Sequence, residues 1–277
     1  MPTRAQSVAT FRALHARPGA FVIPNPWDVG SARLLAGLGF EALATTSSGH
    51  AWSLGRPDGG VTRAEALAHC RDIAGATALP VNADLEKCFA DDPAGVAETI
   101  TLAGATGLAG ASIEDASGHG DSPIYDFDLA VARVRAGVEA NRALDVPMLI
   151  TARAENFLHG RKELADTIRR LQAFEAVGAD VLYAPGLATL DEIRAVTSAV
   201  GKPVNVLMSG FNSKLTVPEL AAAGVKRISV GGALARAALG GLLRAAREIR
   251  DSGSFTYVEA AATTPELNGA LAKWSQT

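Results

Sequence analysis

The chain has 277 residues, of which 48% are hydrophobic and 20% charged, and its formal net charge is −3. This composition is typical of a globular protein. No basic stripe indicates binding to nucleic acid or to an anionic membrane, and no apolar run is long enough to span a bilayer. Residues 1–20 lack the apolar core of a secretory signal peptide. Two cysteines, Cys70 and Cys88, match no zinc or disulfide spacing, so we expect a cytoplasmic protein with free thiols.

Short β-rich runs alternate along the chain with longer Ala-, Leu- and Arg-rich runs of helical period. An opening helix is predicted at 5–16. Strands are then predicted at 21–24, 42–46, 80–83, 107–113, 148–152, 180–183, 203–207 and 227–230. The helices that follow them are predicted at 31–38, from Thr62 onward, and at 93–105, 126–143, 162–177, 190–199, 218–223 and 232–250, the last of these as the final barrel helix.

Turn and cap residues mark the boundaries of these elements. Thr62 with Glu65 three residues later is a capping box, and glycines such as Gly178 and Gly224 stand where helices end. Segments 47–60 and 115–125 are expected to be loops. A tail over 253–277 carries one more short helix, ending near Trp274.

Eight strand–helix pairs with no shift in composition predict one α/β domain over 1–277, a (β/α)8 TIM barrel. Its core is expected at about 20–250, with an N-terminal helix before it and the helical tail after it. A doubly wound open sheet is the alternative. That fold would want a glycine-rich phosphate turn after the first strand, and Asn25-Pro26-Trp27-Asp28 is no such turn.

The chemistry of a barrel enzyme lies where its strands end. Side chains alternate along a strand, so Asn82 and Asp84 share a face that we expect to point into the barrel. The same rule places Glu114 and Arg153 inward on the next two strands. Oxygen ligands without a histidine cluster favour Mg²⁺ or Mn²⁺ over zinc. The alternative is that Asp84 and Glu114 cap loops and bind nothing.

The loops at this end of the barrel add further candidates. The backbone amides of Ser47, Ser48 and Gly49 are candidate anion holders. Asp58 is either a third site carboxylate or part of a plain Pro-Asp-Gly turn. Two loop histidines, His50 and His119, are either proton donors or simply solvated.

Other residues at the strand ends bear on substrate binding, Schiff-base chemistry and phosphate binding. Asn205 closes the seventh strand and is a candidate substrate ligand. No lysine points into the barrel, which argues against Schiff-base chemistry. The pair Gly231-Gly232 either holds a phosphate at a helix N-terminus or forms a tight turn.

Six short motifs resemble the isocitrate lyase/phosphoenolpyruvate mutase superfamily in order and spacing, from about residue 21 to residue 250. They are Pro24-Asn25-Pro26-Trp27-Asp28-Val29-Gly30-Ser31-Ala32, Thr46-Ser47-Ser48-Gly49, Arg56-Pro57-Asp58-Gly59, Pro80-Val81-Asn82-Ala83-Asp84, Ile113-Glu114-Asp115 and Thr151-Ala152-Arg153-Ala154-Glu155. The resemblance implies a barrel that binds Mg²⁺ and assembles as a homotetramer, with a dimer as the alternative, in which the last helix is swapped between subunits. It also implies small 2-oxo acid or phosphonate substrates and an enolate intermediate.

Carried over residue by residue, the resemblance assigns the backbone anion holder to Ser48-Gly49 and the substrate arginine to Arg153. It assigns the metal-shell acids to Asp58, Asp84 and Glu114. The sequence departs from the family at Asn82, where members commonly have a metal-binding aspartate. Glu86, two residues after Asp84, is our hypothesis for the source of the missing charge.

A second departure lies in the loop after Glu114-Asp115. Isocitrate and methylisocitrate lyases carry a Lys-Cys-Gly-His-type stretch there, whose cysteine is the proposed proton donor. This chain has Ala116-Ser117-Gly118-His119 instead, and it lacks the basic, asparagine-bearing loop of the mutase as well. We therefore take His119 as the candidate acid, on a loop that closes over the site.

These observations lead to the hypothesis of a Mg²⁺-dependent carbon–carbon lyase. It would cleave or decarboxylate a small 2-oxo acid or 2-hydroxy dicarboxylate. One alternative is C–P chemistry, as a phosphonomutase or phosphonopyruvate hydrolase. Another is a non-catalytic barrel that binds 2-oxo acids. A class II-type aldolase would need histidine ligands at strand ends, and the sequence has none there.

Overall fold

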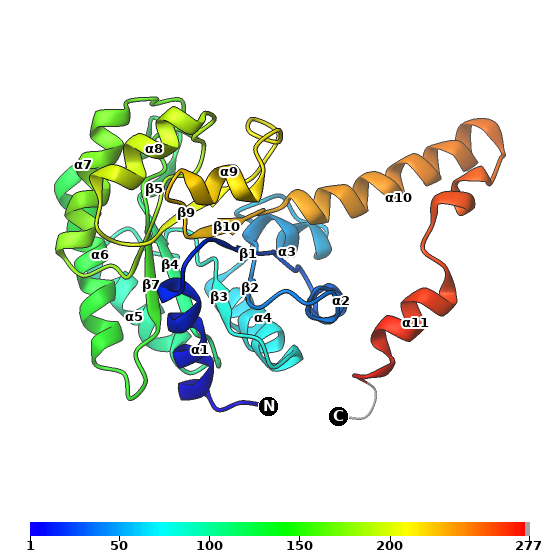
Figure 1. Ribbon diagram of the computed structural model, residues 1–277, viewed down its shortest axis with the longest axis horizontal. Coiled ribbons are helices and arrows are strands. Elements are labelled where there is room, and N and C mark those ends of the chain that lie inside the picture. Colours follow the sequence, from blue (N-terminus) through cyan, green and yellow to red (C-terminus); the bar gives the residue numbers. More distant parts are fainter. Residues whose placement is uncertain (275–277) are drawn as a thin grey trace.

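The computed structural model describes residues 1–274, and within them eight parallel strands form a barrel (Figure 1). The strands are β1 (Phe21–Ile23), β2 (Leu43–Ala44), β3 (Val81–Ala83), β4 (Gly110–Glu114), β7 (Leu149–Arg153), β8 (Val181–Tyr183), β9 (Val204–Leu207) and β10 (Arg227–Ser229). They pair in the order β1-β10-β9-β8-β7-β4-β3-β2. The amide of Ala44 donates to the carbonyl of Pro24 (3.0 Å) and bridges β2 to the end of β1. The predicted (β/α)8 architecture is confirmed.

Helices surround the barrel, as the alternating pattern predicts (Figure 1). They are α1 (Arg4–Ala16), α2 (Val29–Gly37), α4 (Arg63–Ala76), α5 (Pro93–Ala103), α6 (Phe127–Arg142), α7 (Leu164–Ala176), α8 (Leu190–Ala199) and α9 (Val217–Ala222). The predicted capping box of α4 is present, with Thr62 and Glu65 exchanging side-chain and backbone hydrogen bonds. Gly178 and Gly224 follow α7 and α9 with φ of 106° and 85°, a conformation that favours glycine.

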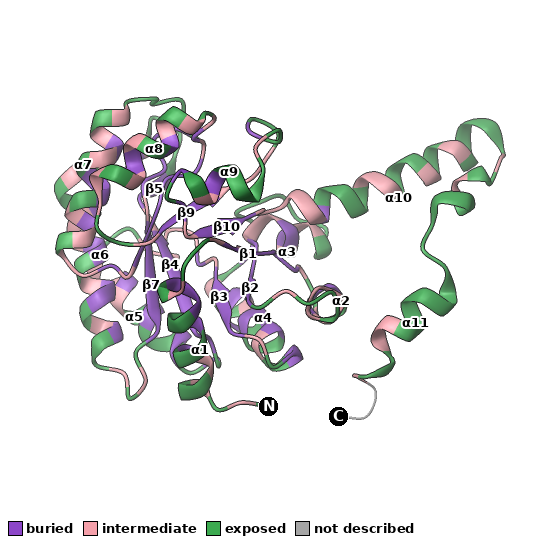
Figure 2. Cartoon of the chain, viewed as in Figure 1, coloured by how far each residue is buried: buried purple, intermediate pink, exposed green. Residues whose placement is uncertain are grey.

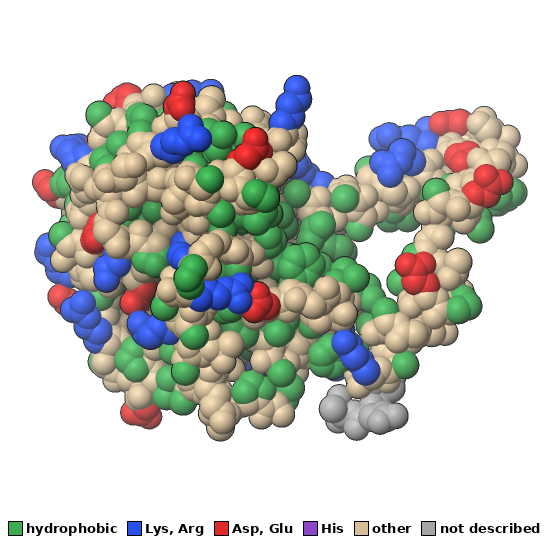
Figure 3. Space-filling view, in the orientation of Figure 1, with side chains coloured by type: hydrophobic (Ala, Val, Ile, Leu, Met, Phe, Trp, Pro, Cys, Tyr) green, Lys and Arg blue, Asp and Glu red, His purple; other side chains and the backbone are tan. Residues whose placement is uncertain are grey.

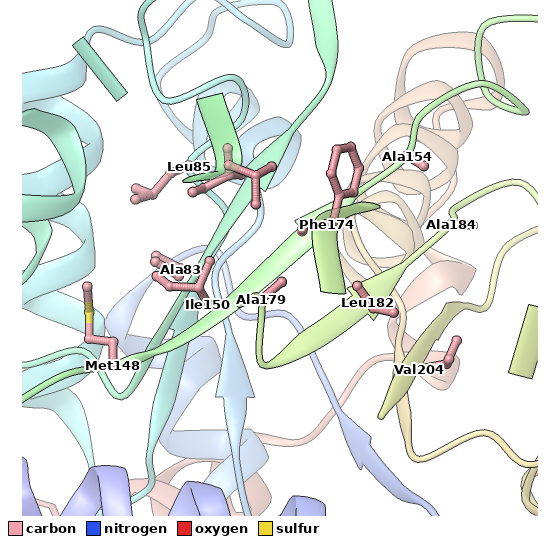
Figure 4. Close-up of a cluster of buried hydrophobic side chains, with 14 of the residues drawn as sticks. Ala83, Leu85, Met148, Ile150, Ala154, Phe174, Ala179, Leu182, Ala184 and Val204 are labelled. Atoms are coloured by element: carbon pink, nitrogen blue, oxygen red, sulfur yellow. The ribbon is translucent and has the colours of Figure 1, made fainter. Parts of the chain in front are cut away.

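The main hydrophobic core lies between the outer faces of the strands and the helices. Figure 4 shows Ile150 of β7 and Leu182 of β8 in this layer, together with Phe174 of α7. All three are fully buried, and burying side chains of this size contributes about 1.5–3 kcal/mol each. Val81 belongs to the same core. Because side chains alternate along a strand, its neighbour Asn82 faces the barrel interior, as predicted.

A second, smaller core forms where α1 packs under the barrel. Phe11 of α1 is fully buried against a cluster that includes Phe21 of β1 and Leu149 of β7. These two residues begin their strands, so α1 covers the amino-terminal end of the barrel. Access to the interior is therefore from the carboxyl ends of the strands.

Two segments expected to be loops contain regular structure instead. Residues Ser47–Ser53 form a short helix, α3, because Thr46 stands before it as an N-cap whose hydroxyl accepts a bond from the Gly49 amide (3.3 Å). Residues Ala116–His119 (β5) and Ser122–Ile124 (β6) pair as an antiparallel hairpin. Both segments are rich in glycine and serine, whose local preference for turns masked the helix and the hairpin.

The prediction of a final barrel helix at 232–250 is wrong in its placement. The helix α10 (Ala233–Ser252) forms, but it projects away from the barrel (Figure 1), and Ala235 is the residue of α10 that is buried. Figure 2 shows that the rest of α10 is largely exposed. Leu242 and Leu243 are 63% and 51% exposed. Such an apolar surface on an isolated helix is typical of an interface with another chain.

The tail after α10 turns back toward the barrel. It contains a short 3-10 helix, η1 (Thr256–Ala260), and α11 (Thr264–Ala272), which contacts α2. Hydrophobic side chains also gather on the surface around the base of α10 (Figure 3). The final part of the predicted tail, 275–277, lies outside the described residues. In the part of the chain that is described, no helix combines the length and apolarity that crossing a membrane requires.

Candidate active site

A cavity of about 220 Å³ opens at the carboxyl ends of the barrel strands. This is the end at which barrel enzymes place their chemistry. Several of the residues predicted from the sequence line it together: Ser47, Ser48, Asp58, Asn82, Asp84, Arg153 and Asn205. The structure therefore brings together side chains that lie as far as 158 positions apart in the chain, from Ser47 to Asn205.

Arg153, the last residue of β7, contacts three carboxylates. Its Nη1 lies 2.9 Å from Asp84 Oδ1, its Nη2 3.2 Å from Glu114 Oε2 and its Nε 2.7 Å from Glu155 Oε1. The guanidinium also lies 4.9 Å from the ring centroid of Tyr183. Burial disfavours its charge, but the carboxylates outweigh burial and raise the pKa of Arg153 well above its ordinary value. The guanidinium is therefore a fixed positive charge at the cavity wall.

The strand register explains why these groups meet. Glu114 pairs with Arg153 across β4 and β7, and Arg153 pairs with Tyr183 across β7 and β8. Residues paired on neighbouring parallel strands point to the same side of the sheet. Three consecutive strands thus deliver a carboxylate, a guanidinium and a phenol to one layer of the barrel.

Asp84 is held by backbone contacts as well as by Arg153. Its Oδ2 accepts a hydrogen bond from the Ser47 amide (3.1 Å), and its own amide donates to the Thr45 hydroxyl (2.8 Å). Asp58 lies at the exposed mouth of the same cavity. Desolvation and then the charge of Asp84 raise the pKa of Asp58 above its ordinary value. The two carboxylates are therefore close enough to repel each other.

Glu114 and Glu86 are destabilised as anions in a similar way. Burial raises the pKa of Glu114 strongly, and Glu155 and Asp84 add to the increase while Arg153 opposes it. Burial, then Asp84 and Asp58, raise the pKa of Glu86 to about 7. Glu86 also has φ of 51°, a strained conformation for a non-glycine residue. Crowded carboxylates of this kind are relieved by a bound cation.

The donors at the cavity suit a cation that keeps much of its water. Within residues 1–274, no three His, Cys, Asp or Glu side chains converge as a ready-made metal site. The buried Oδ1 of Asn82 has no hydrogen-bond partner in the described part of the chain, however, and Asn82 lines the cavity with Asp84. Mg²⁺ retains several water ligands and binds through one or two carboxylates. The oxygen donors present therefore fit Mg²⁺ held largely through water.

A glycine on the next strand makes room for Asn82. A Cβ on Gly110 would lie 2.6 Å from Asn82 Oδ1 and 3.0 Å from the Leu149 carbonyl oxygen. The first distance is shorter than real side chains show, and the second is a tight contact with a backbone atom that cannot easily move aside. Gly110 is therefore required for Asn82 to occupy this position.

Comparison with known proteins assigns the chain to a family. Residues 11–250 match the model of the family described as phosphoenolpyruvate phosphomutase. The chain belongs to the phosphoenolpyruvate phosphomutase family. The matched range contains every residue that lines the cavity, whereas η1 and α11 lie beyond it.

Members of this family and superfamily are among the similar proteins. A crystal structure from Burkholderia cenocepacia J2315, provisionally described as a lyase/mutase, is 58% identical, with a TM-score of 0.94 over 97% of this chain and 96% of that one. A 2,3-dimethylmalate lyase, described as a PEP mutase/isocitrate lyase superfamily member, is 26% identical, with a TM-score of 0.86 over 100% and 98% of the two chains. The oxaloacetate decarboxylase of Chromohalobacter salexigens is 29% identical over 87% of this chain and 84% of its own length.

Some of the site residues predicted from the sequence do not line the cavity directly. Glu114 reaches it through its contact with Arg153. Gly49 is buried, and its amide donates to Thr46 rather than toward the cavity. His119 lies on the β5–β6 hairpin with 61% of its side chain exposed, and its Nε2 is 3.4 Å from Asp91 Oδ2.

Glu86 lies in a small recess beside the main cavity, next to two histidines. His50 and His69 line this recess with Glu86 and Asp84, and their rings stack at 3.8 Å. Burial, and then the proximity of His50, lower the pKa of His69 to about 4. His69 is therefore neutral at physiological pH. Burial also lowers the pKa of His50, and the stacked pair fills space behind the site.

The sequence analysis did not single out Arg227, which also lines the cavity. Arg227 Nε donates to Asn205 Oδ1 (2.8 Å), and its Nη2 donates to Thr151 Oγ1 (3.0 Å). The available signal was the alternation of β10, which places Arg227 on the same inward face as Ser229. It was missed because Arg227 begins its strand, whereas barrel chemistry is sought at strand ends.

Proposed function

We propose that this chain is a magnesium-dependent lyase that cleaves or decarboxylates a small 2-oxo acid or 2-hydroxy dicarboxylate through an enolate. The observation that carries the proposal is the cluster of Arg153 with Asp84, Glu114 and Glu155 at the cavity wall. This cluster combines a fixed cation with carboxylates that favour a second, bound cation. Such an arrangement suits the stabilisation of an oxyanion that develops during bond cleavage.

The named relatives support the substrate class. An oxaloacetate decarboxylase and a 2,3-dimethylmalate lyase are similar to this chain over most of its length. Their names indicate a 2-oxo dicarboxylate and a 2-hydroxy dicarboxylate. The cavity of about 220 Å³ is of a size suited to a small acid of this kind rather than to a large cofactor.

Asp84 and Asn82 would hold Mg²⁺, or Mn²⁺ in its place, while Asp58, Glu86 and Glu114 act through bound water. When bound, the metal supplies positive charge next to the substrate oxygen on which negative charge develops. Asp84 is already oriented for this role by the Ser47 amide and by Arg153. The side-chain oxygen of Asn82 carries no charge, so the site holds the metal less tightly than an aspartate would.

The substrate's carboxylate and oxyanion contact residues of the cavity wall. Arg153 neutralises the negative charge, and Asn205 lines the same wall. The amides of Ser47 and Gly49 already donate to Asp84 and Thr46. We therefore assign the substrate-binding amide to Ser48.

His119 remains the predicted proton donor. The role requires the β5–β6 hairpin to close over the cavity, because the His119 ring now contacts Asp91 outside it. An exposed histidine on a short hairpin is suited to such a movement. The proposal for the metal and for Arg153 does not depend on it.

The test is turnover by the purified chain with Mg²⁺ of oxaloacetate, of 2-hydroxy dicarboxylates and of phosphonopyruvate. Loss of one preorganised cationic donor costs about 10²–10³ in kcat, so Arg153→Ala should lose at least that much. Arg169→Ala is the matched control, because Arg169 is exposed on α7. Chelation should abolish turnover, and added Mg²⁺ should restore it. Full activity in Arg153→Ala would refute the site.

One other activity has a specific observation in its favour. The matching family model is described as a phosphomutase, which acts on a C–P bond. Turnover of phosphonopyruvate but of no carbon acid would assign that chemistry to the chain. Tight binding of oxalate without turnover of any candidate would instead indicate a non-catalytic binding barrel.

A further inference from the structure

Arg227 is a buried cation of the cavity that has only neutral hydrogen-bond partners. It lines the cavity and is 3% exposed. Its two hydrogen bonds go to the amide oxygen of Asn205 and to the hydroxyl of Thr151. Its Nη1 is buried and has no partner in the described chain. Burial lowers the pKa of Arg227 to about 9, and none of the groups that act on it is a carboxylate.

Three other arginines with little exposure contact carboxylates or backbone carbonyls. Arg153 contacts three carboxylates, and Arg170 pairs with Asp115 and with Asp166. Arg133 donates to backbone carbonyls of the β3–α5 loop. A buried guanidinium without such partners is costly. Arg227 differs from these arginines, because it lines the cavity and donates to neither a carboxylate nor a backbone carbonyl among the described residues.

A second buried polar atom near Arg227 is also unpaired. The hydroxyl of Ser112 on β4 has no hydrogen-bond partner among residues 1–274, and the residue is 3% exposed and lines the cavity. Ser112 pairs in register with Thr151 of β7. The guanidinium of Arg227 reaches across the barrel from β10 to that same Thr151. Ser112 and Arg227 therefore both lie beside Thr151, and they line the part of the cavity that we call its floor.

We propose that Arg227 and Ser112 form an anion subsite on the cavity floor, which binds the second carboxylate of a dicarboxylic substrate. The inference rests on the proposed function and names its substrate class more narrowly. The side of the cavity that contains Asp84 is rich in carboxylates and suits a cation. The floor contains the uncompensated positive charge of Arg227 and suits an anion. A 2-oxo or 2-hydroxy dicarboxylate can bind the cation with its oxo or hydroxy acid end and the floor with its second carboxylate. A monocarboxylate leaves Arg227 unpaired.

The test compares two ligands that share a carbon chain and differ at its far end. Malate carries a second carboxylate where 2-hydroxybutyrate carries a methyl group. Isothermal titration with Mg²⁺ present should show malate binding at least about tenfold more tightly to the wild-type chain, the range expected for one charge-assisted hydrogen bond. Equal affinity of the wild-type chain for the two ligands would overturn the subsite.

The variants separate the subsite from a structural role of Arg227. Arg227→Gln should remove the preference for malate and leave 2-hydroxybutyrate affinity within about twofold, because only the charge-dependent contact is lost. Arg227→Lys should keep part of the preference, and the exposed control Arg169→Gln all of it. A preference for malate that persists in Arg227→Gln would overturn the proposal.

Ser112→Ala carries the test if Arg227→Gln fails to fold, since it removes only a hydroxyl. It should weaken malate binding several-fold without changing 2-hydroxybutyrate binding, and an unchanged preference would overturn the subsite. The outcome also distinguishes this inference from the proposed function. If the chain turns over 2-oxo acids but its preference for malate does not depend on Arg227, the proposed function is supported and the anion subsite is refuted. A malate preference that depends on Arg227, with no turnover of any candidate substrate, would support the anion subsite and count against the proposed lyase function.

Discussion

Replacement of Arg153 by alanine should destabilise the fold as well as the site. The substitution leaves the carboxylates of Asp84, Glu114 and Glu155 without the cation that they contact at 2.9, 3.2 and 2.7 Å. Removing one partner of a buried ion pair costs about 3–5 kcal/mol. Because Arg153 serves three carboxylates and its side chain is 13% exposed, we expect a loss near the upper end of that range at about pH 8.

The loss should depend on pH in a defined direction. Burial already raises the pKa of Glu114 in the folded chain, and removal of Arg153 raises it further because Arg153 opposes the increase. A carboxyl whose folded pKa exceeds its unfolded value binds protons more tightly in the folded state. Its destabilising effect is absent below the unfolded pKa and grows as the pH rises toward the folded pKa. The deficit of Arg153→Ala relative to wild type should therefore shrink from about pH 8 to about pH 5.

Urea unfolding at these two pH values, at one protein concentration, measures the effect. Arg153→Lys is the matched variant, which retains the charge but not the planar geometry that reaches three carboxylates, so its deficit should be smaller. A deficit of Arg153→Ala below about 1 kcal/mol, the value typical of exposed pairs, would refute the reasoning. A deficit that does not change with pH would also refute it.

Three further predictions concern other parts of the chain. Burial lowers the pKa of His69 to about 4, so protons favour the unfolded chain and stability is lost as the pH falls from about 6.5 to about 4. His69→Gln should reduce this loss by up to about 3 kcal/mol in urea unfolding, and the exposed control His159→Gln should leave it unchanged. Asn82→Asp adds a charge beside Asp84 and should tighten Mg²⁺ binding by about tenfold or more in calorimetric titration; unchanged affinity would count against the metal site. Replacing Leu242 and Leu243 of α10 by serine should reduce the molar mass measured by light scattering if this exposed face joins subunits, and an unchanged homo-oligomer would exclude that role.

Much of the barrel could be predicted from local patterns. Alternation of apolar residues located the strands, and caps such as Thr62 located helix starts, because both signals depend on neighbours a few residues apart. The same alternation correctly turned Asn82 inward. The helix at Ser47–Ser53 and the β5–β6 hairpin were missed because glycine- and serine-rich sequence is equally compatible with turns. The course of α10 could not be predicted, since an amphipathic helix shows that it has an apolar face but not what covers it.

The sequence by itself determined the succession of strands and helices, the inward carboxylates and the family. The tertiary structure decided which of those groups meet. Arg153 contacts Asp84 and Glu114 only because β3, β4 and β7 are neighbouring strands in register. Arg227 begins its strand, yet it reaches Thr151 on the far side of the interior. Hydrophobic periodicity and secondary-structure propensity depend on residues a few positions apart. Contacts across the barrel exist only after its strands have closed around a common centre.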